Sequence, residues 1–319
     1  MQKIKKNIFI PSYDKTPLEV RVKYWQDGLG RIVNGGNDIY KDNTSIYNSG
    51  IQNSSIGSSN DNEVEINGIK AVIISHPYGP LGGDFNNNVV VAVEHYFLSM
   101  GYLTVAFNFR GVGNSGGRTS WSGEPECGDY KSIVEVLLNS GRTKDEIIIE
   151  LPKISELIIV GYSYGSLIAS SFTTSLSIPT FYILISYPLS VRWFLTFFHT
   201  STYINHLISL INSNSKVLFI YGNYDQFTRS SRFKNWVREN NLINNPRWTI
   251  KELRGADHFY VTGSMEISLI QELNEWINNT STNRINNDDG DELLVENNKS
   301  EGMDLKNSNN SSNAENSNN

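Results

Sequence analysis

The stretch Leu157–Leu167 constrains the fold more than any other part of the sequence. It reads as a β-branched apolar run, then the pattern G-x-S-x-G, then small residues suited to a helix packed closely on a strand. A sharp strand-to-helix turn needs glycines two residues before and two after its central residue, because side chains there would clash. We therefore predict that Ser163 lies on such a turn, with its hydroxyl raised above a sheet, as a candidate nucleophile.

Apolar runs and helical segments alternate along most of the chain. Two strands are expected first, at 7–11 and 18–25, and the second alternates Val20, Val22 and Tyr24 with charged residues, as a half-exposed edge strand would. Further strands are expected at 71–75, 103–107, 181–185, 216–221 and 248–253, with helices at 87–100, 129–138, 232–239 and 264–277. This alternation predicts an α/β protein with a mostly parallel central sheet and helices on both faces.

Composition divides the chain into one large domain, residues 1–280, and a tail. Gly28–Asn62 is rich in Asn, Ser and Gly, and we expect a flexible insertion there. Residues 281–319 hold eight acidic and three basic residues, so they carry −5 of the net charge of −6 and are expected to be disordered. The remaining charge of −1 argues against a nucleic-acid surface, and the acidic tail is a candidate contact for protein partners.

Three sequence features bear on the compartment and the surface. The single cysteine, Cys127, excludes an internal disulfide and fits a reducing compartment, and the N-terminus lacks the apolar core of a secretory signal. The longest apolar stretch, 181–198, is interrupted by Pro188 and Arg192, which argues against a transmembrane span. A cytoplasmic protein is therefore expected.

Two aromatic or glycine-rich segments have more than one interpretation. The run Gly111–Gly116 matches G-x-G-x-x-G but continues into a loop instead of a helix, so we expect a tight turn near a pocket rim and no dinucleotide cofactor.

The connection 187–215 is too short for a large lid, which predicts a minimal cap. Core packing is favoured over an apolar acyl pocket for its aromatic residues, namely Trp193, Phe194, Phe197 and Phe198.

Two further polar residues follow predicted strands. Asp225 ends the turn after strand 216–221, and His258 ends the turn after strand 248–253. The carboxyl ends of parallel strands meet at one edge of a sheet, where ligands bind. A serine hydroxyl needs an imidazole to accept its proton, and the imidazole needs a carboxylate to fix its tautomer. The order Ser163, Asp225, His258 therefore predicts one site for nucleophilic catalysis.

Together these motifs resemble the α/β-hydrolase superfamily, and within it a group of small, nearly uncapped serine hydrolases. The resemblance covers residues 7–277 apart from the insertion and rests on five segments: His76-Pro77, Phe109–Ser115, Gly161–Gly165, Gly222–Asp225 and Gly255–His258. It implies the α/β-hydrolase fold, Ser163 as nucleophile, His258 as general base and Asp225 as the orienting acid. It implies no metal and no cofactor.

The resemblance also implies an oxyanion hole made by backbone amides. One is the amide of Tyr164, which begins the helix after the serine. Many relatives have His-Gly where this chain has His76-Pro77, and proline has no N–H to donate. The second amide is therefore assigned to Tyr78, with Gly79 as the alternative.

Each candidate residue also has a structural interpretation. Ser163 could be an ordinary turn serine, Asp225 could cap a helix, and Asp257 competes for the acid role because it precedes His258. Arg110 could meet an anionic substrate group or form a structural salt bridge. His76 is expected to hold its loop, Cys127 is given no nucleophilic role, and no metal-ligand spacing connects the other histidines, His95, His199 and His206.

These observations predict a serine hydrolase. We expect it to cleave a carboxylic ester or thioester with a small or medium acyl group, taken from a small-molecule substrate, through an acyl-enzyme. A peptidase of the prolyl or aminopeptidase kind would use the same three residues. A catalytically silent hydrolase fold that serves as an interaction protein is the alternative from a different class.

Overall fold

The computed structural model describes residues 1–33, 68–173, 176–197 and 199–280. Most of the predicted insertion at 28–62 and all of the tail at 281–319 lie outside the described residues. The chain divides into two units, Met1–Glu272 and Leu273–Asn319. All the named strands and helices belong to the first unit, and residues 273–280 of the second are helical.

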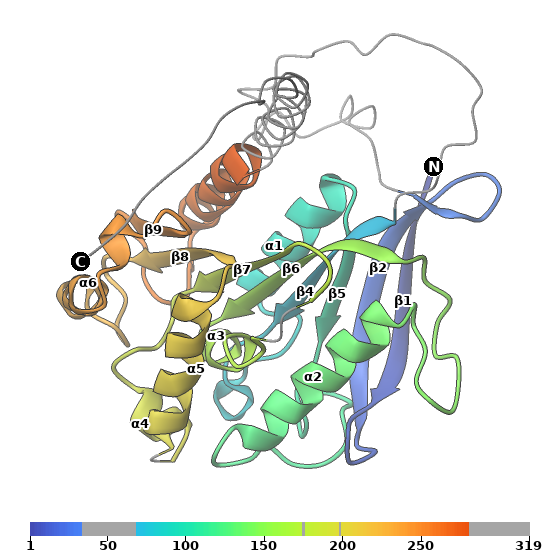
Figure 1. Ribbon diagram of the computed structural model, residues 1–319, viewed down its shortest axis with the longest axis horizontal. Coiled ribbons are helices and arrows are strands. Elements are labelled where there is room, and N and C mark those ends of the chain that lie inside the picture. The colour runs from blue at the N-terminus through green and yellow to red at the C-terminus, as the bar shows by residue number, and fades with distance from the viewer. Residues whose placement is uncertain (34–67, 174–175, 198, 281–319) are drawn as a thin grey trace, which may run out of the picture. The chain divides into compact units, whose positions relative to one another are not determined.

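One sheet organises the first unit (Figure 1). Strands β1 and β2 are antiparallel to their neighbours, whereas the strands from β5 to β9 in the sheet order are mutually parallel. The short β3 (Ile32–Val33) pairs with β2. The order across the sheet is β1 (Gln2–Pro11), β2 (Pro17–Gln26), β5 (Leu103–Phe107), β4 (Ile69–Ser75), β6 (Ile154–Tyr162), β7 (Thr180–Ile185), β8 (Lys216–Gly222) and β9 (Trp248–Leu253). The predicted mostly parallel sheet is confirmed.

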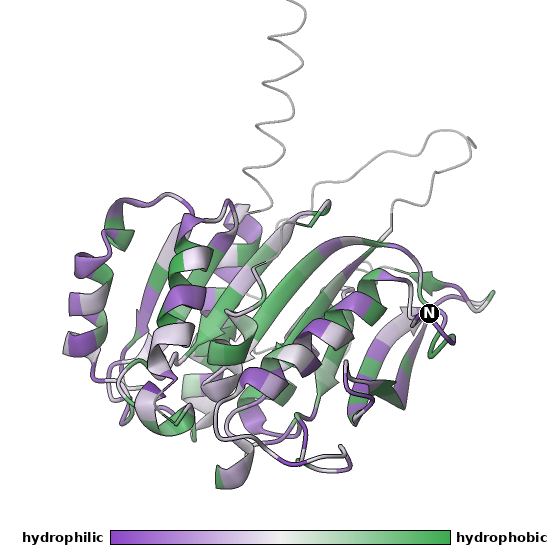
Figure 2. Cartoon of the chain, turned by 60° about the horizontal axis from the view of Figure 1, so that its bottom comes forward, coloured by the Kyte–Doolittle hydropathy of each residue, from purple (hydrophilic) through white to green (hydrophobic). Residues whose placement is uncertain are grey.

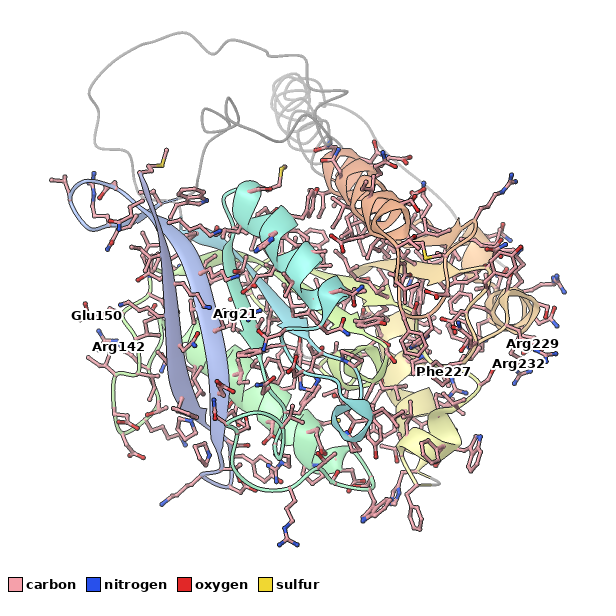
Figure 3. All side chains as sticks on the ribbon, turned by 180° about the vertical axis from the view of Figure 1, so that it is seen from behind. Arg21, Arg142, Glu150, Phe227, Arg229 and Arg232 are labelled. Atoms are coloured by element: carbon pink, nitrogen blue, oxygen red, sulfur yellow. The ribbon has the colours of Figure 1, made fainter. Side chains whose placement is uncertain are left out.

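Helices cover both faces of this sheet, as predicted. Helix α1 (Asn88–Ser99) lies on one face, and α2 (Glu124–Leu138), α3 (Tyr164–Ala169) and α5 (Thr200–Asn212) lie on the other (Figures 1 and 3). The remaining helical segments are η2 (Gly79–Leu81), α4 (Arg192–Leu195), α6 (Ser230–Glu239) and η3 (Leu242–Asn244). The central strands are hydrophobic along their length, because both of their faces are covered (Figure 2).

Strand β2 corrects one expectation. It is not a half-exposed edge strand: β1 occupies the edge, and β2 is enclosed between β1 and β5. Its charged residues Arg21 and Lys23 are buried, at 4% and 7% exposure. Both are paired with Glu94 of α1, at 2.9 Å and 2.6 Å. Sequence alternation cannot distinguish charges that face solvent from charges that pair with a buried partner.

Helix α2 begins five residues earlier than predicted. It starts at Glu124 rather than near Asp129, with Pro125 in its first turn and Gly123 before it at φ 77°. Proline is tolerated in the first turn of a helix because the amide it lacks would have no helical partner there. The earlier start brings Glu126, which is fully buried, onto the helix.

The aromatic residues after β7 are exposed, so the prediction of core packing is wrong for them. Trp193, Phe194 and Phe197 are 54%, 56% and 55% exposed. Helix α4 is a single turn, and its buried positions are taken by Arg192 and Leu195. Phe198 lies outside the described residues. In the part of the chain that the structure describes, no helix has both the length and the apolar character to cross a bilayer.

Candidate active site

Ser163 occupies the sharp turn that its flanking glycines predict. Strand β6 ends at Tyr162, helix α3 begins at Tyr164, and Ser163 between them has φ 53° and ψ −120°. A side chain on Gly161 would come within 2.5 Å of the Gly165 carbonyl oxygen. A side chain on Gly165 would lie 2.5 Å from the Ser75 carbonyl oxygen. Both glycines are therefore required, because α3 packs directly on the ends of β4 and β6.

Gly165→Ala is expected to disrupt this turn. The new methyl group would also lie 2.7 Å from the His76 carbonyl oxygen, and neither backbone carbonyl can yield alone. We expect the free energy of unfolding to fall by about 1–3 kcal/mol. Urea denaturation measures this loss. Gly263→Ala is the control, because nothing lies within 4 Å of its added methyl group. Equal stabilities of the two variants would contradict the packing argument.

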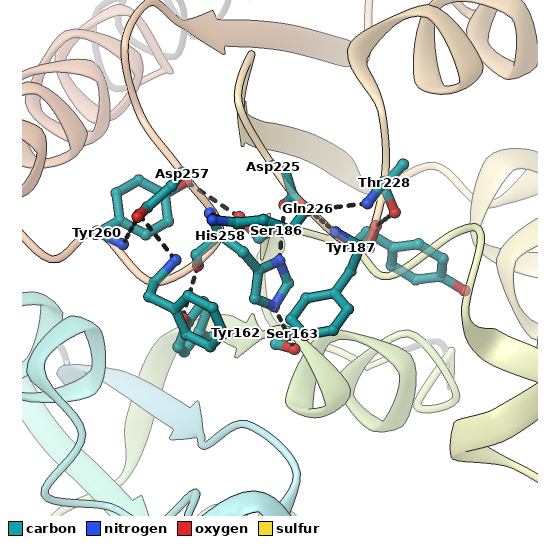
Figure 4. Close-up of polar contacts among 12 residues, drawn as sticks. Tyr162, Ser163, Ser186, Tyr187, Asp225, Gln226, Thr228, Asp257, His258 and Tyr260 are labelled. Carbon is teal, nitrogen blue, oxygen red and sulfur yellow. Dashed lines mark hydrogen bonds and ion pairs between the residues drawn. The ribbon is translucent and has the colours of Figure 1, made fainter.

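His258 connects Ser163 with Asp225. Its Nε2 lies 2.8 Å from the Ser163 Oγ, and its Nδ1 lies 2.7 Å from Oδ2 of Asp225 (Figure 4). The Asp225 and His258 side chains are 1% and 2% exposed. Because a carboxylate accepts, Nδ1 carries the hydrogen, and Nε2 is left to accept the serine hydroxyl proton. The structure thus brings together the three residues that the sequence singled out.

The two candidate carboxylates have different partners. The second oxygen of Asp225 accepts hydrogen bonds from the amides of Phe227 and Thr228, both at 2.8 Å. Asp257 accepts from the amides of Phe259 and Tyr260. Asp225 is thus the carboxylate that meets the imidazole. It fixes a turn at the same time, although it does not cap α6, which begins at Ser230 after Arg229.

The two residues predicted to supply oxyanion amides lie beside each other. Tyr164 begins α3, and Tyr78 precedes the short η2 turn. Their rings pack edge to face with centroids 5.0 Å apart. The first amides of a helix have no partner within it, so the amide of Tyr164 is available to a ligand. These positions are compatible with the predicted pair of donors.

His76 joins the loops after β4 and β5, as its expected structural role requires. Its Nε2 accepts a hydrogen bond from the Phe109 amide at 3.0 Å, and its Nδ1 lies 2.5 Å from the Pro77 carbonyl oxygen. The ring is therefore neutral, with its hydrogen on Nδ1. Burial lowers the pKa of His76 from 6.5 to about 4. Protonation would remove the acceptor that Phe109 uses.

This lowered pKa predicts a pH dependence of stability. The unfolded chain binds the His76 proton near pH 6.5 and the native state only near pH 4, so acid favours unfolding. The contribution of His76 is complete above pH 6.5 and is lost as the pH falls towards 4. We expect this loss to be on the order of 3 kcal/mol. Urea denaturation of wild type and His76→Gln across this range measures it, and parallel pH profiles would contradict it.

Arg110 is a structural residue. Its guanidinium makes two bonds to Asp129, at 2.8 Å and 2.6 Å, and a third to Asp14 at 3.0 Å. It also lies over the Tyr13 ring. Of the two interpretations drawn from the sequence, the structure favours the salt bridge over contact with an anionic substrate, because the guanidinium is already paired with two carboxylates.

The Gly111–Gly116 run is a tight turn. Gly111 and Gly113 both have positive φ, at 73° and 55°. Glu19 of β2 accepts from the amide and the side chain of Asn114, at 2.9 Å and 2.8 Å. The run is followed by loop residues as far as α2, so it lacks the helix that a dinucleotide fingerprint requires.

Other reactive groups have no part in this arrangement. Burial raises the pKa of the Cys127 thiol to about 11, which keeps it protonated. Among the described residues, no three His, Cys, Asp or Glu side chains gather as a set of metal ligands.

Three residues around His258 were not identified from the sequence. The Tyr162 hydroxyl donates to the His258 carbonyl, the Gln226 side chain accepts from the His258 amide, and the Phe227 ring packs against the imidazole with centroids 4.5 Å apart. Their position in the sequence could have pointed to them, because Tyr162 precedes Ser163, and Gln226 and Phe227 follow Asp225.

No protein-family model and no curated protein matches this sequence. Solved structures do match it. An α/β serine hydrolase homologue from Coxiella burnetii is 22% identical with a TM-score of 0.55, over 84% of this chain and 95% of that one. A Pyrococcus furiosus esterase is 19% identical with a TM-score of 0.56, over 86% and 92%.

A third similar structure is an α/β serine hydrolase without a lid, from Xanthomonas campestris. It is 17% identical with a TM-score of 0.52, over 85% of this chain and 94% of that one. At such identities the likeness establishes the arrangement of strands and helices, and it covers nearly the full length of each of these proteins.

Proposed function

Starting from an α/β-hydrolase fold, we propose that this protein is a serine hydrolase that acts through an acyl-enzyme formed on Ser163. The observation that carries the proposal is the position of His258, whose two ring nitrogens contact Ser163 and Asp225. A serine hydroxyl that donates to a buried, carboxylate-oriented imidazole is activated for attack on a carbonyl carbon.

The reaction follows from these contacts. The Ser163 oxygen attacks the carbonyl carbon while His258 Nε2 takes the hydroxyl proton. Asp225 stabilises the imidazolium that forms, and the amides of Tyr164 and Tyr78 donate to the oxyanion. The imidazolium then gives its proton to the leaving group. Water, activated by the same imidazole, attacks the acyl carbon and releases the acid, and the proton returns to Ser163.

The proposed substrate is a carboxylic ester or thioester with a small or medium acyl group. This choice is supported by the short connection after β7, where α4 is a single turn and is followed by α5. The exposed aromatic side chains of this connection offer apolar contacts for such a group. One similar structure is an esterase, and another is a hydrolase without a lid.

A labelling and substrate experiment tests the proposal. The purified, folded protein is treated with a fluorophosphonate probe, and the modified residue is identified by mass spectrometry. Turnover of a panel of p-nitrophenyl esters and acyl thioesters is then compared with that of aminoacyl-naphthylamides. We expect labelling at Ser163 and turnover of the esters or thioesters. Preferential cleavage of the amides would favour the peptidase alternative, and an unlabelled folded protein would refute hydrolase function.

A further inference from the structure

The main chain of His258 is held from two sides. The Tyr162 hydroxyl donates to its carbonyl oxygen at 2.7 Å, and its amide donates to Oε1 of Gln226 at 3.0 Å (Figure 4). Tyr162 directly precedes Ser163, and Gln226 directly follows Asp225. The chain neighbours of the nucleophile and of the acid therefore both bind the residue that connects them.

The contact from Tyr162 is rigid. Tyr162 is 1% exposed at the end of β6, and its ring packs edge to face on Tyr260 with centroids 6.3 Å apart. Burial also raises the pKa of Tyr162, so the phenol keeps its hydrogen at neutral pH. The donor of this bond is thus constant.

The bonds of the imidazole itself change during the proposed reaction. Once Ser163 is acylated, its oxygen has no hydrogen to donate to Nε2, yet the same ring must then activate water. The two bonds to the His258 main chain involve no group that gains or loses a proton. Acylation of Ser163 therefore removes neither of these two bonds.

We propose that Tyr162 and Gln226 are positioning residues that keep the His258 imidazole within reach of the Ser163 oxygen through both halves of the reaction. This inference rests on the proposed function. Both residues bind the main chain of His258, so their effect on the reaction passes through His258. A displacement of about 1 Å at a reacting group can cost up to about a hundredfold in rate.

Tyr162→Phe tests the first contact, with Tyr182→Phe as its matched control. Tyr182 lies on the neighbouring strand β7. Its hydroxyl is also buried and also donates to a backbone carbonyl, that of Phe172. Both variants should lose similar thermal stability. Only Tyr162→Phe should lower kcat, by about tenfold or more with KM unchanged, together with the rate of fluorophosphonate labelling. A kcat within twofold of wild type for Tyr162→Phe would overturn the proposal.

Gln226 is tested by two substitutions. Gln226→Met removes the acceptor and should lower kcat. Gln226→Glu keeps an acceptor at the same place and should restore kcat. Equal kcat values for Gln226→Met and wild type would overturn the role of Gln226.

A double variant separates positioning from a general loss of structure. In a His258→Ala background, Tyr162→Phe should cause no further loss of residual turnover, because it acts through the imidazole. A further tenfold loss would contradict this. The rate of hydrogen exchange at the His258 amide gives a readout that is independent of activity. This rate should rise in Gln226→Met. An unlabelled wild-type protein with a protected His258 amide would refute the hydrolase function while leaving the contact itself demonstrated.

Discussion

Ser163→Ala is expected to abolish turnover, lowering kcat by about 10⁴-fold or more and eliminating fluorophosphonate labelling. The variant removes the hydroxyl oxygen that lies 2.8 Å from His258 Nε2. Thermal stability should change little or rise, because residues kept for function often reduce stability.

The measurement combines labelling, turnover and thermal denaturation, with Ser171→Ala as the control. Ser171 lies just beyond α3, and its hydroxyl donates to the Ile168 carbonyl at 2.6 Å, away from His258. Labelling of the control should equal that of wild type. A Ser163→Ala protein that unfolds far below the wild-type temperature would identify Ser163 as a structural turn residue, and persistent turnover would locate the nucleophile elsewhere.

Asp129→Asn should cause a large loss of stability, about 3–5 kcal/mol, because it leaves the Arg110 guanidinium buried without its main counter-charge. The Arg110 side chain is 9% exposed and that of Asp129 is fully buried. Asp129 also accepts a hydrogen bond from the Ser12 hydroxyl at 2.5 Å, so the substitution disturbs the contacts of α2 with the segments after β1 and β5. Urea denaturation at pH 7 measures the change.

Glu135→Gln on the same helix is the matched control. Its carboxylate lies 3.7 Å from Lys131, but both side chains are 62% exposed. Exposed pairs of this kind contribute little, so we expect a change within about 0.5 kcal/mol. If the two variants were equally stable, Arg110 would not depend on Asp129, and its availability to an anionic substrate would have to be reconsidered.

The strand-turn-helix segment around Ser163 illustrates what local sequence can predict. Gly161 and Gly165 have steric roles that follow from the turn alone, and the structure confirms that neither position has room for a side chain. The parallel strands were likewise predictable from their apolar runs, because strands covered on both faces are mostly hydrophobic. The start of helix α2 was harder to predict, because Pro125 and Gly128 near its N-terminus are residue types that disfavour a helix.

The environment of β2 and of the segment after β7 depended on contacts between distant parts of the chain. Arg21 and Lys23 are buried because Glu94 lies opposite them, a partner that no local pattern reveals. Trp193 and Phe194 are exposed because α4 is one turn long and turns Arg192 and Leu195 inward. Burial is a property of the assembled layers, and residue type alone predicts it poorly in short elements.

For the candidate site, the sequence by itself predicted the serine, the imidazole and a preferred carboxylate, Asp225, because each follows a strand in a parallel sheet and such strands end at one edge. Only the tertiary structure shows which carboxylate the imidazole meets. Asp225 contacts His258 Nδ1, whereas Asp257 accepts a hydrogen bond from the amide of Tyr260. The tertiary structure also decided that Tyr162 and Gln226 hold His258. Hydrogen bonds depend on positions to within a few tenths of an ångström, and those positions are fixed when the loops pack together.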